Sequence, residues 1–210
     1  MNLIDFLIAE NWLKTPQIIE AFKKIKRVDF LPAEALAKAS LPEDIKNLAE
    51  LDEALPIGLG QTISQPLVVA FMLELLCPQP GHKILDIGSG SGWTSALLAD
   101  IVGKQGKVIA IEIIPELKEF GKNNAIKYQG NIKFVCTDGS KGYPKEAPFD
   151  RIMASASLQE KDLPLAWKEQ LATNGVIVTP IKNSIWTFKK LVNGEFEEKE
   201  YPGFIFVPFI

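Results

Sequence analysis

The 210-residue sequence contains very little cysteine and histidine. Its two cysteines, Cys77 and Cys136, lie far apart in apolar surroundings, without the close spacing of a metal site, so we expect reduced thiols in the core and no bound metal. The single histidine, His82, precedes a predicted strand in the segment P-G-H-K, which favours a turn residue over a catalytic base. Chemistry that depends on histidine or on a metal is therefore not indicated.

Long apolar runs and an excess of basic charge are also missing. No apolar stretch approaches the roughly 20 residues of a membrane-spanning helix, and the acidic start M-N-L-I-D does not resemble a secretory signal. The formal net charge of −3 provides no positive field that would attract nucleic acid or an anionic membrane. We therefore expect a cytoplasmic protein, monomeric, with neither nucleic acid nor a membrane as a partner.

Alternating strands and helices begin at residue 83. This alternation predicts a parallel, doubly wound α/β sheet with a Rossmann-like arrangement, and the Asn193-Gly194 dipeptide predicts a hairpin that makes the far edge antiparallel. We expect one compact unit over 66–210, preceded by a largely helical extension over 1–65 in which Thr15 caps a helix that begins at Pro16. The predicted strands are 83–87, 107–112, 132–137, 149–155, 175–181 and 185–192, with the terminal F-I-F-V-P-F after the hairpin turn, and the predicted helices are 2–9, 16–25, 33–39, 66–77, 91–102, 115–127 and 163–171.

Three glycines stand at alternate positions after the first predicted strand of this unit. They are Gly88, Gly90 and Gly92 in the stretch D-I-G-S-G-S-G-W, where glycine permits a tight turn and close approach of backbone to a ligand. The dinucleotide fingerprint G-x-G-x-x-G requires its third glycine where Trp93 stands, so a pyrophosphate ligand is disfavoured. A nucleoside triphosphate is disfavoured as well, because no G-K-S/T follows.

Three acidic residues end successive predicted strands at this same edge. Glu112 lies about twenty residues beyond the glycine loop, where a carboxylate accepts both hydroxyls of a ribose. Asp138, before Gly139, is placed to accept a hydrogen bond from an adenine amino group, and Asp86 adds a third negative charge. This combination suits a cation that carries ribose and adenine, such as S-adenosylmethionine. The alternative is that each acid is a helix cap or a solvated charge.

The segment L-P-I-G-L-G-Q-T-I-S-Q-P, from Leu55 to Pro66, is the most unusual in the chain. It leads into the helix that precedes the first strand of the sheet, so it can fold back over the predicted cofactor edge. In extended backbone, Thr62 and Ser64 on either side of Ile63 present their hydroxyls on one face. The alternative is that Ser64 is simply the N-cap of the helix that follows.

These segments, together with I-I-E-A-F-K-K-I-K-R-V-D-F-L-P, G-K-V-I-A-I-E, D-G-S-K-G-Y-P-K-E-A-P-F-D-R-I and the terminal F-V-P-F, resemble the protein-L-isoaspartate O-methyltransferase family over nearly the whole chain. The resemblance implies a methyltransferase of the Rossmann-like fold with a seven-stranded sheet. It also implies methyl transfer from S-adenosylmethionine to the free α-carboxylate of L-isoaspartyl residues in damaged proteins and peptides. Ser64 matches the family's active-site serine. The implied cofactor contacts are Thr62, Ile63, Ser64, Asp86, Gly88, Ser89, Gly90, Gly92, Glu112, Asp138 and Gly139.

A carboxylate acceptor is already ionised at neutral pH and needs no general base, so we expect Ser64 to orient it by a hydrogen bond. We expect the substrate chain to contact the Q-T-I-S segment and the C-terminal F-I-F-V-P-F.

The sequence departs from the family pattern after the fourth predicted strand. There Leu158-Gln159-Glu160-Lys161 replace a proline-containing turn, in a loop expected near cofactor and substrate. This departure keeps open a carboxyl methyltransferase that acts on a different peptide substrate. A non-catalytic S-adenosylmethionine-binding protein is a further alternative, whereas RNA methylation is disfavoured by the acidic balance and by the absence of an N/D-P-P-Y/F motif.

Overall fold

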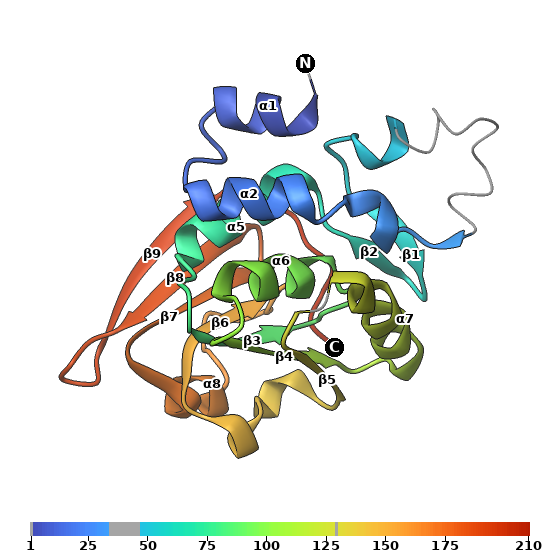
Figure 1. The fold of residues 1–210 in the computed structure, drawn as a ribbon. Helices are drawn as coiled ribbons and strands as arrows, with labels where there is room; N and C mark the ends of the chain where they lie inside the picture. The colour runs from blue at the N-terminus through green and yellow to red at the C-terminus, as the bar shows by residue number, and fades with distance from the viewer. Residues whose placement is uncertain (1, 34–46, 129) are drawn as a thin grey trace.

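The computed structural model describes residues 2–33, 47–128 and 130–210, and a seven-stranded sheet forms its centre (Figure 1). The strand order is β5-β4-β3-β6-β7-β8-β9. Neighbours from β5 to β7 pair in parallel, and the last two pairings are antiparallel. The predicted fold class is thereby confirmed. The strands are β3 (Lys83–Ile87), β4 (Lys107–Glu112), β5 (Ile132–Cys136), β6 (Phe149–Ala154), β7 (Leu171–Ile181), β8 (Ser184–Lys190) and β9 (Phe196–Pro202).

Helices cover both faces of this sheet because successive side chains of each buried strand point to opposite sides. In β3, Ile84 packs into one apolar cluster with α5, α6 and α7, whereas Leu85 and Ile87 pack into a second cluster that includes Trp167 of α8. Figure 1 shows α8 on the face opposite α5 and α6, with α1 and α2 lying outside those two helices. The helices are α1 (Leu3–Ala9), α2 (Pro16–Lys24), α5 (Pro66–Leu76), α6 (Trp93–Val102), α7 (Pro115–Ala125) and α8 (Leu165–Gln170), with short 3-10 turns η1 (Arg27–Phe30), η2 (Ile126–Tyr128), η3 (Gly139–Lys141) and η4 (Pro144–Glu146).

The N-terminal helices share the core of the sheet. Ile18 and Phe22 of α2 are buried in the cluster that α5 and α6 also enter. Thr15 is the N-cap residue of α2, but its hydroxyl donates to Glu74 of α5 at 2.7 Å instead of capping its own helix. The same carboxylate accepts from the backbone N–H groups of Lys14 and Thr15, each at 2.8 Å. A domain boundary at residue 65 stays a prediction, and the helix predicted over 33–39 lies, apart from its first residue, outside the described residues.

The segment before α5 forms a hairpin that the sequence did not predict. Strands β1 (Leu55–Gly58) and β2 (Gln61–Ile63) pair antiparallel in a separate two-stranded sheet. The turn between them has φ values of +92° at Gly58, +53° at Leu59 and +73° at Gly60, a left-handed run that glycine on both sides makes accessible. The hairpin thus holds Thr62 in extended backbone, as expected.

The C-terminal segment differs from expectation. The Asn193-Gly194 turn does join two antiparallel strands, but the partner is the polar β9, and the terminal F-I-F-V-P-F lies outside the sheet. It returns to the carboxyl edge of the parallel strands, where the N–H of Ser157 donates to the Val207 carbonyl at 2.8 Å. The N–H of Phe209 donates in turn to the Ser157 carbonyl at 2.9 Å.

Both cysteines are exposed, which corrects the expectation of core thiols. Cys77 is the left-handed C-cap of α5, and Cys136 ends the edge strand β5, so each leaves the interior where its element stops. Among the described residues, no helix has the length and apolar content needed to cross a membrane.

Candidate active site

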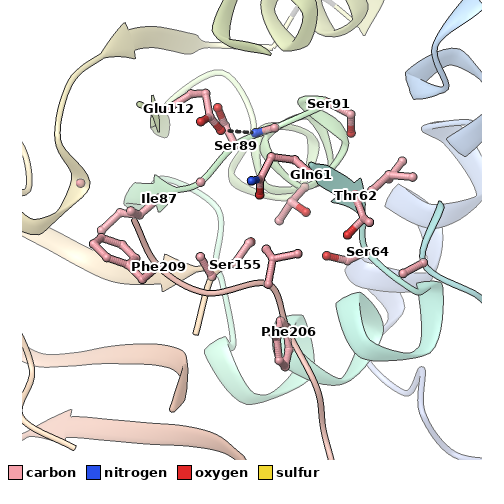
Figure 2. A pocket seen from close by; sticks show the side chains of 18 of the residues that line it. Gln61, Thr62, Ser64, Ile87, Ser89, Ser91, Glu112, Ser155, Phe206 and Phe209 are labelled. Carbon is pink, nitrogen blue, oxygen red and sulfur yellow. Dashed lines mark hydrogen bonds between the residues drawn. The ribbon is translucent and has the colours of Figure 1, made fainter. Parts of the chain in front are cut away.

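A cavity of about 360 Å³ opens at the carboxyl edge of the parallel strands (Figure 2). Its walls come from β2, from the glycine loop after β3, from the end of β4 and from the C-terminal segment 205–210. The predicted site residues that line it are Thr62, Ile63, Ser64, Gly88, Ser89, Gly90, Glu112 and Gly139. Two distant parts of the chain, residues 61–65 and 87–91, therefore meet around one space, as the sequence predicted.

The glycine loop takes its shape from backbone conformations that side chains disfavour. Gly88, Gly90 and Gly92 have φ values of +77°, +48° and +84°. The N–H groups of Gly88 and Ser89 both donate to the Ile111 carbonyl, at 2.8 and 3.0 Å, which ties the loop to β4. At Gly92 a Cβ atom would also lie 2.5 Å from the carbonyl oxygen of Gly121 in α7. At Gly92 the loop can therefore pass α7 only without a side chain.

Glu112 is the charged residue of the cavity wall, and backbone donors hold it in place. Its Oε2 accepts from the Gly90 N–H at 2.9 Å, and its Oε1 accepts from the N–H groups of Ile113 and Ile114 at 3.0 and 3.1 Å. Although the residue is only 6% exposed, Oε2 keeps a lone pair for another donor. The geometry is that of a fixed acceptor facing the cavity, as Figure 2 shows.

Asp86 lies behind the glycine loop and does not line the cavity. It is fully buried and accepts a short hydrogen bond from the Ser95 hydroxyl of α6. Burial, and to a smaller extent the nearby charge of Glu112, raise the pKa of this carboxyl to about 6 against the opposing hydrogen bond from Ser95. In this structure Asp86 joins the start of α6 to the end of β3.

Asp138 is likewise outside the cavity wall, although its neighbour Gly139 lines it. Its carboxylate caps η3 by accepting from the N–H and the hydroxyl of Ser140, at 2.9 and 2.7 Å, and Lys141 lies 3.3 Å away. These hydrogen bonds lower the pKa of the Asp138 carboxyl. Cofactor contacts by Asp86, Gly92 and Asp138 stay predictions, as do those of the predicted residues that line the cavity.

Thr62 and Ser64 both turn their hydroxyls toward the cavity (Figure 2). The alternative role of Ser64 as a helix cap is wrong, because Gln65 is the N-cap residue of α5. The first turn of that helix is instead capped from a distance, since the Leu67 N–H donates to Asp52 at 2.8 Å. Ser64 is therefore available for a ligand.

The C-terminal segment also contributes to the cavity, as expected for F-I-F-V-P-F. Phe206, Val207 and Phe209 line it, and Ile205 and Ile210 lie at its exposed mouth, with 88% and 65% of their surface accessible. Gln61 lines the cavity as part of the expected Q-T-I-S segment, whereas the sequence assigned no individual role to Ser91, Ser155 or Ala156, which also line it. Their only signal was proximity in the chain to predicted site residues.

The divergent residues 158–161 do not line the cavity, so the expectation of a loop near cofactor and substrate holds only for its first residues. The Leu158 N–H donates to the Pro180 carbonyl at 3.0 Å. Lys161 pairs with Glu198 of β9 at 2.8 Å and lies 4.2 Å from the ring centre of Trp186 in β8. Only the start of the connection, at Ser155 and Ala156, reaches the cavity. The residues that depart from the family pattern therefore pack against the antiparallel edge of the sheet.

The side chains that line the cavity suit a sulfonium cofactor with a polar amino-acid end. Apolar side chains such as Ile87 and Ile111 dominate the walls, and Glu112 is the only charged residue among the described lining residues. The Ser89 hydroxyl and the Trp93 indole N–H are buried in the wall without a hydrogen-bond partner in the described part of the chain. Within the same residues, no group of three or more His, Cys, Asp and Glu could hold a metal ion.

Comparison with known proteins agrees with this geometry. The family model of protein-L-isoaspartate(D-aspartate) O-methyltransferase matches residues 1–210. The protein-L-isoaspartate O-methyltransferase of Methanopyrus kandleri is 40% identical over 215 residues, covering 100% of this chain and 90% of its own. Protein-L-isoaspartate O-methyltransferase 2 of Archaeoglobus fulgidus is 42% identical over 197 residues, covering 91% of this chain and 84% of its own.

Two solved structures share the fold. A Plasmodium falciparum protein described as a protein-L-isoaspartate O-methyltransferase, in complex with S-adenosyl-L-homocysteine, superposes with a TM-score of 0.83 at 21% identity, covering 100% of this chain and 99% of that one. A second protein-L-isoaspartate O-methyltransferase gives a TM-score of 0.84 at 27% identity over 98% of this chain and 64% of its own. With the full-length family match and relatives at about 40% identity, this chain belongs to the protein-L-isoaspartate(D-aspartate) O-methyltransferase family.

Proposed function

We propose that this protein transfers a methyl group from S-adenosylmethionine to the free α-carboxylate of L-isoaspartyl residues in damaged proteins and peptides. The observation that carries the proposal is the Ser64 hydroxyl, turned into an apolar cavity that the glycine loop and Glu112 close from the other side. Membership of the family supports the same reaction.

The residues fit the cofactor. Glu112 is a fixed acceptor suited to ribose hydroxyls, and the glycine loop offers backbone close to the ligand. The unpartnered Ser89 hydroxyl and Trp93 N–H suit the polar methionine end. When bound, S-adenosylmethionine supplies a methyl group that moves from sulfur to a carboxylate oxygen, so no proton has to be transferred.

The acceptor side of the cavity needs to orient an oxygen and keep water away. A carboxylate with a pKa of about 4 is ionised at neutral pH, and no histidine, lysine or arginine lines the cavity among the described residues. Ser64 is suited to donate one hydrogen bond to that carboxylate. Alignment of the reacting atoms then becomes the main contribution of the protein to the rate.

Isoaspartyl-containing peptides and proteins are the proposed partners. We also propose that the enzyme works as a cytoplasmic monomer. It acts without nucleic acid, because the net charge of −3 offers no positive field for a phosphate backbone.

The test is methyl transfer from labelled S-adenosylmethionine to matched peptides that contain either isoaspartate or aspartate at one position. We expect label on the isoaspartyl peptide alone. Ser64→Ala should reduce kcat about 10- to 100-fold while adenosylhomocysteine still binds. Ser184→Ala is the control, because that hydroxyl donates to Glu200 on the antiparallel edge, away from the cavity.

Equal labelling of both peptides would contradict the isoaspartyl specificity. Binding of adenosylhomocysteine with no methyl transfer to either peptide would favour a non-catalytic binding protein.

A further inference from the structure

We infer that Arg27 and Asp52 are positioning residues that together fix Ser64 in the cavity wall, an inference that rests on the proposed function. Neither residue lines the cavity. Both act from behind the segment that carries Ser64: Arg27 binds the Ser64 carbonyl, and Asp52 binds the residues that follow Ser64.

Arg27 holds the irregular backbone that leads to the site. It is only 6% exposed, and its Nη1 donates to the carbonyls of Ala49 and Leu51 at 3.4 and 3.0 Å. Its Nη2 donates to the carbonyls of Glu53 and Ser64 at 2.6 and 3.3 Å. The planar guanidinium therefore connects four carbonyl groups in a fixed fork, which a flexible point charge cannot reproduce.

The same side chain contacts the opposite wall of the site. Its guanidinium carbon lies 5.5 Å from the ring centre of Trp93, the cavity-lining first residue of α6. Phe22 of α2 packs edge-on against that ring, at 5.6 Å between ring centres. Arg27 thus joins the acceptor segment to the cofactor side of the cavity through one buried group.

Asp52 fixes the chain directly after Ser64. One carboxylate oxygen accepts from the Leu67 N–H at 2.8 Å, and the other accepts from Nε2 of Gln65 at 3.1 Å. The negative charge of Asp52 also acts on Arg27, where it opposes the larger effect of burial, which lowers the pKa of the guanidinium to about 10. Arg27 therefore stays charged at neutral pH.

The consequence is that Ser64 is located by two charged side chains and not by a regular strand, since β2 ends at Ile63. A displacement of about 1 Å at a reacting group costs about 100-fold in rate. A substitution of Arg27 or Asp52 should therefore displace the Ser64 hydroxyl and lower kcat before it affects any other property of the enzyme.

The experiment is a double-mutant cycle between Arg27→Lys and Ser64→Ala, measured as kcat and KM for an isoaspartyl peptide. Lysine keeps the charge but loses the fork. We expect Arg27→Lys to lower kcat about tenfold when Ser64 is present and by less than about twofold in the Ser64→Ala background. Lys24→Ala is the control, because this exposed lysine pairs with Asp100 outside the cavity, and it should leave kcat unchanged.

Equal losses in the two backgrounds would overturn the inference, because a general structural role acts whether or not Ser64 is present. If Arg27→Lys does not fold, Asp52→Asn takes its place in the cycle. An asparagine amide presents an acceptor to only one of the two donors and a repelling N–H to the other.

Hydrogen exchange provides a readout that is independent of catalysis. In Arg27→Lys, or in Asp52→Asn if needed, the amides of residues 61–65 and of Leu67 should exchange about tenfold faster or more, with those of β3 unchanged. Unchanged exchange at these amides would overturn the positioning role. An unaltered enzyme that fails to methylate isoaspartyl peptides would overturn the proposed function alone, since this measurement needs no activity.

Discussion

Replacing Gly121 by alanine tests how closely α7 must approach the glycine loop. Gly121 lies within α7, and an added Cβ would stand 2.6 Å from the Gly90 carbonyl oxygen and 3.0 Å from the Gly92 nitrogen. Both are backbone atoms, so no side-chain rotation can relieve the contact. Either the helix or the loop has to move.

Two opposing effects set the change in the free energy of unfolding of Gly121→Ala. Alanine gains about 1 kcal/mol over glycine in a helix interior. Overpacking against rigid neighbours costs about 1–3 kcal/mol, and contact with backbone places this site toward the upper end. The net loss should be about 1–2 kcal/mol, which lowers the Tm of a chain of this length by about 3–6 °C.

Movement of the loop should also weaken ligand binding, because the Gly90 N–H donates to Glu112. The assay is thermal unfolding of Gly121→Ala with calorimetric titration by adenosylhomocysteine. Asn123→Ala is the control, since it changes an exposed position of the same helix and alters helix propensity alone. A Gly121→Ala protein that is at least as stable as its parent and binds adenosylhomocysteine equally well would refute the reasoning.

Three further predictions follow from the site. Asp86→Asn should gain stability relative to its parent, by on the order of 2–3 kcal/mol, as pH rises from about 4 to 7 in urea titrations. The reason is that burial raises the pKa of that carboxyl from 3.8 to about 6, so the folded parent binds a proton that the unfolded chain has already lost, and deprotonation over this range destabilises the parent alone. A stability difference between variant and parent that does not change with pH would contradict this prediction. Glu112→Gln should weaken adenosylhomocysteine binding about tenfold or more in calorimetry, because an amide presents an N–H to one of the backbone donors now bound there; unchanged affinity would count against the assigned role. Ile205→Ser should raise KM for isoaspartyl peptides with apolar flanking residues severalfold without changing adenosylhomocysteine affinity, whereas Val192→Ser, equally exposed on the far hairpin, should leave KM unaltered.

The parallel sheet and the cofactor side of the site were predictable from the sequence. The strands β3 to β6 are five or six residues long and mostly apolar, and helical segments alternate with them, so the order of elements follows from pattern alone. The glycine loop is equally readable, because positive φ at Gly88, Gly90 and Gly92 requires the residue type that the sequence shows. Glu112 follows from its place at the end of the neighbouring strand.

What failed depended on distant contacts. Cofactor contacts by Asp86 and Asp138 stay predictions: Ser95 of α6 engages the Asp86 carboxylate away from the cavity, a partner that no local pattern signals. Asp138 caps η3 through Ser140, two residues further on, which is the helix-cap alternative that the sequence left open. Polar β9 lacks the apolar alternation of a buried strand because it is the edge strand of the sheet. The divergent residues 158–161 were expected near the cavity but do not line it, because their contacts are with β7, β8 and β9, which follow them in the chain.

The β1–β2 hairpin stands apart from the main sheet, yet Ile57 touches the glycine loop, since a Cβ on Gly90 would lie 3.3 Å from its Cδ1. The hairpin and the sheet are thus separate pieces of structure that line one cavity, and they approach each other at Ile57 as well as through the contact of Arg27 with Trp93. A different hairpin grafted here to change the range of acceptors would have to keep the isoleucine methyl and the Ser64 carbonyl that Arg27 binds, whereas the sheet could stay as it is.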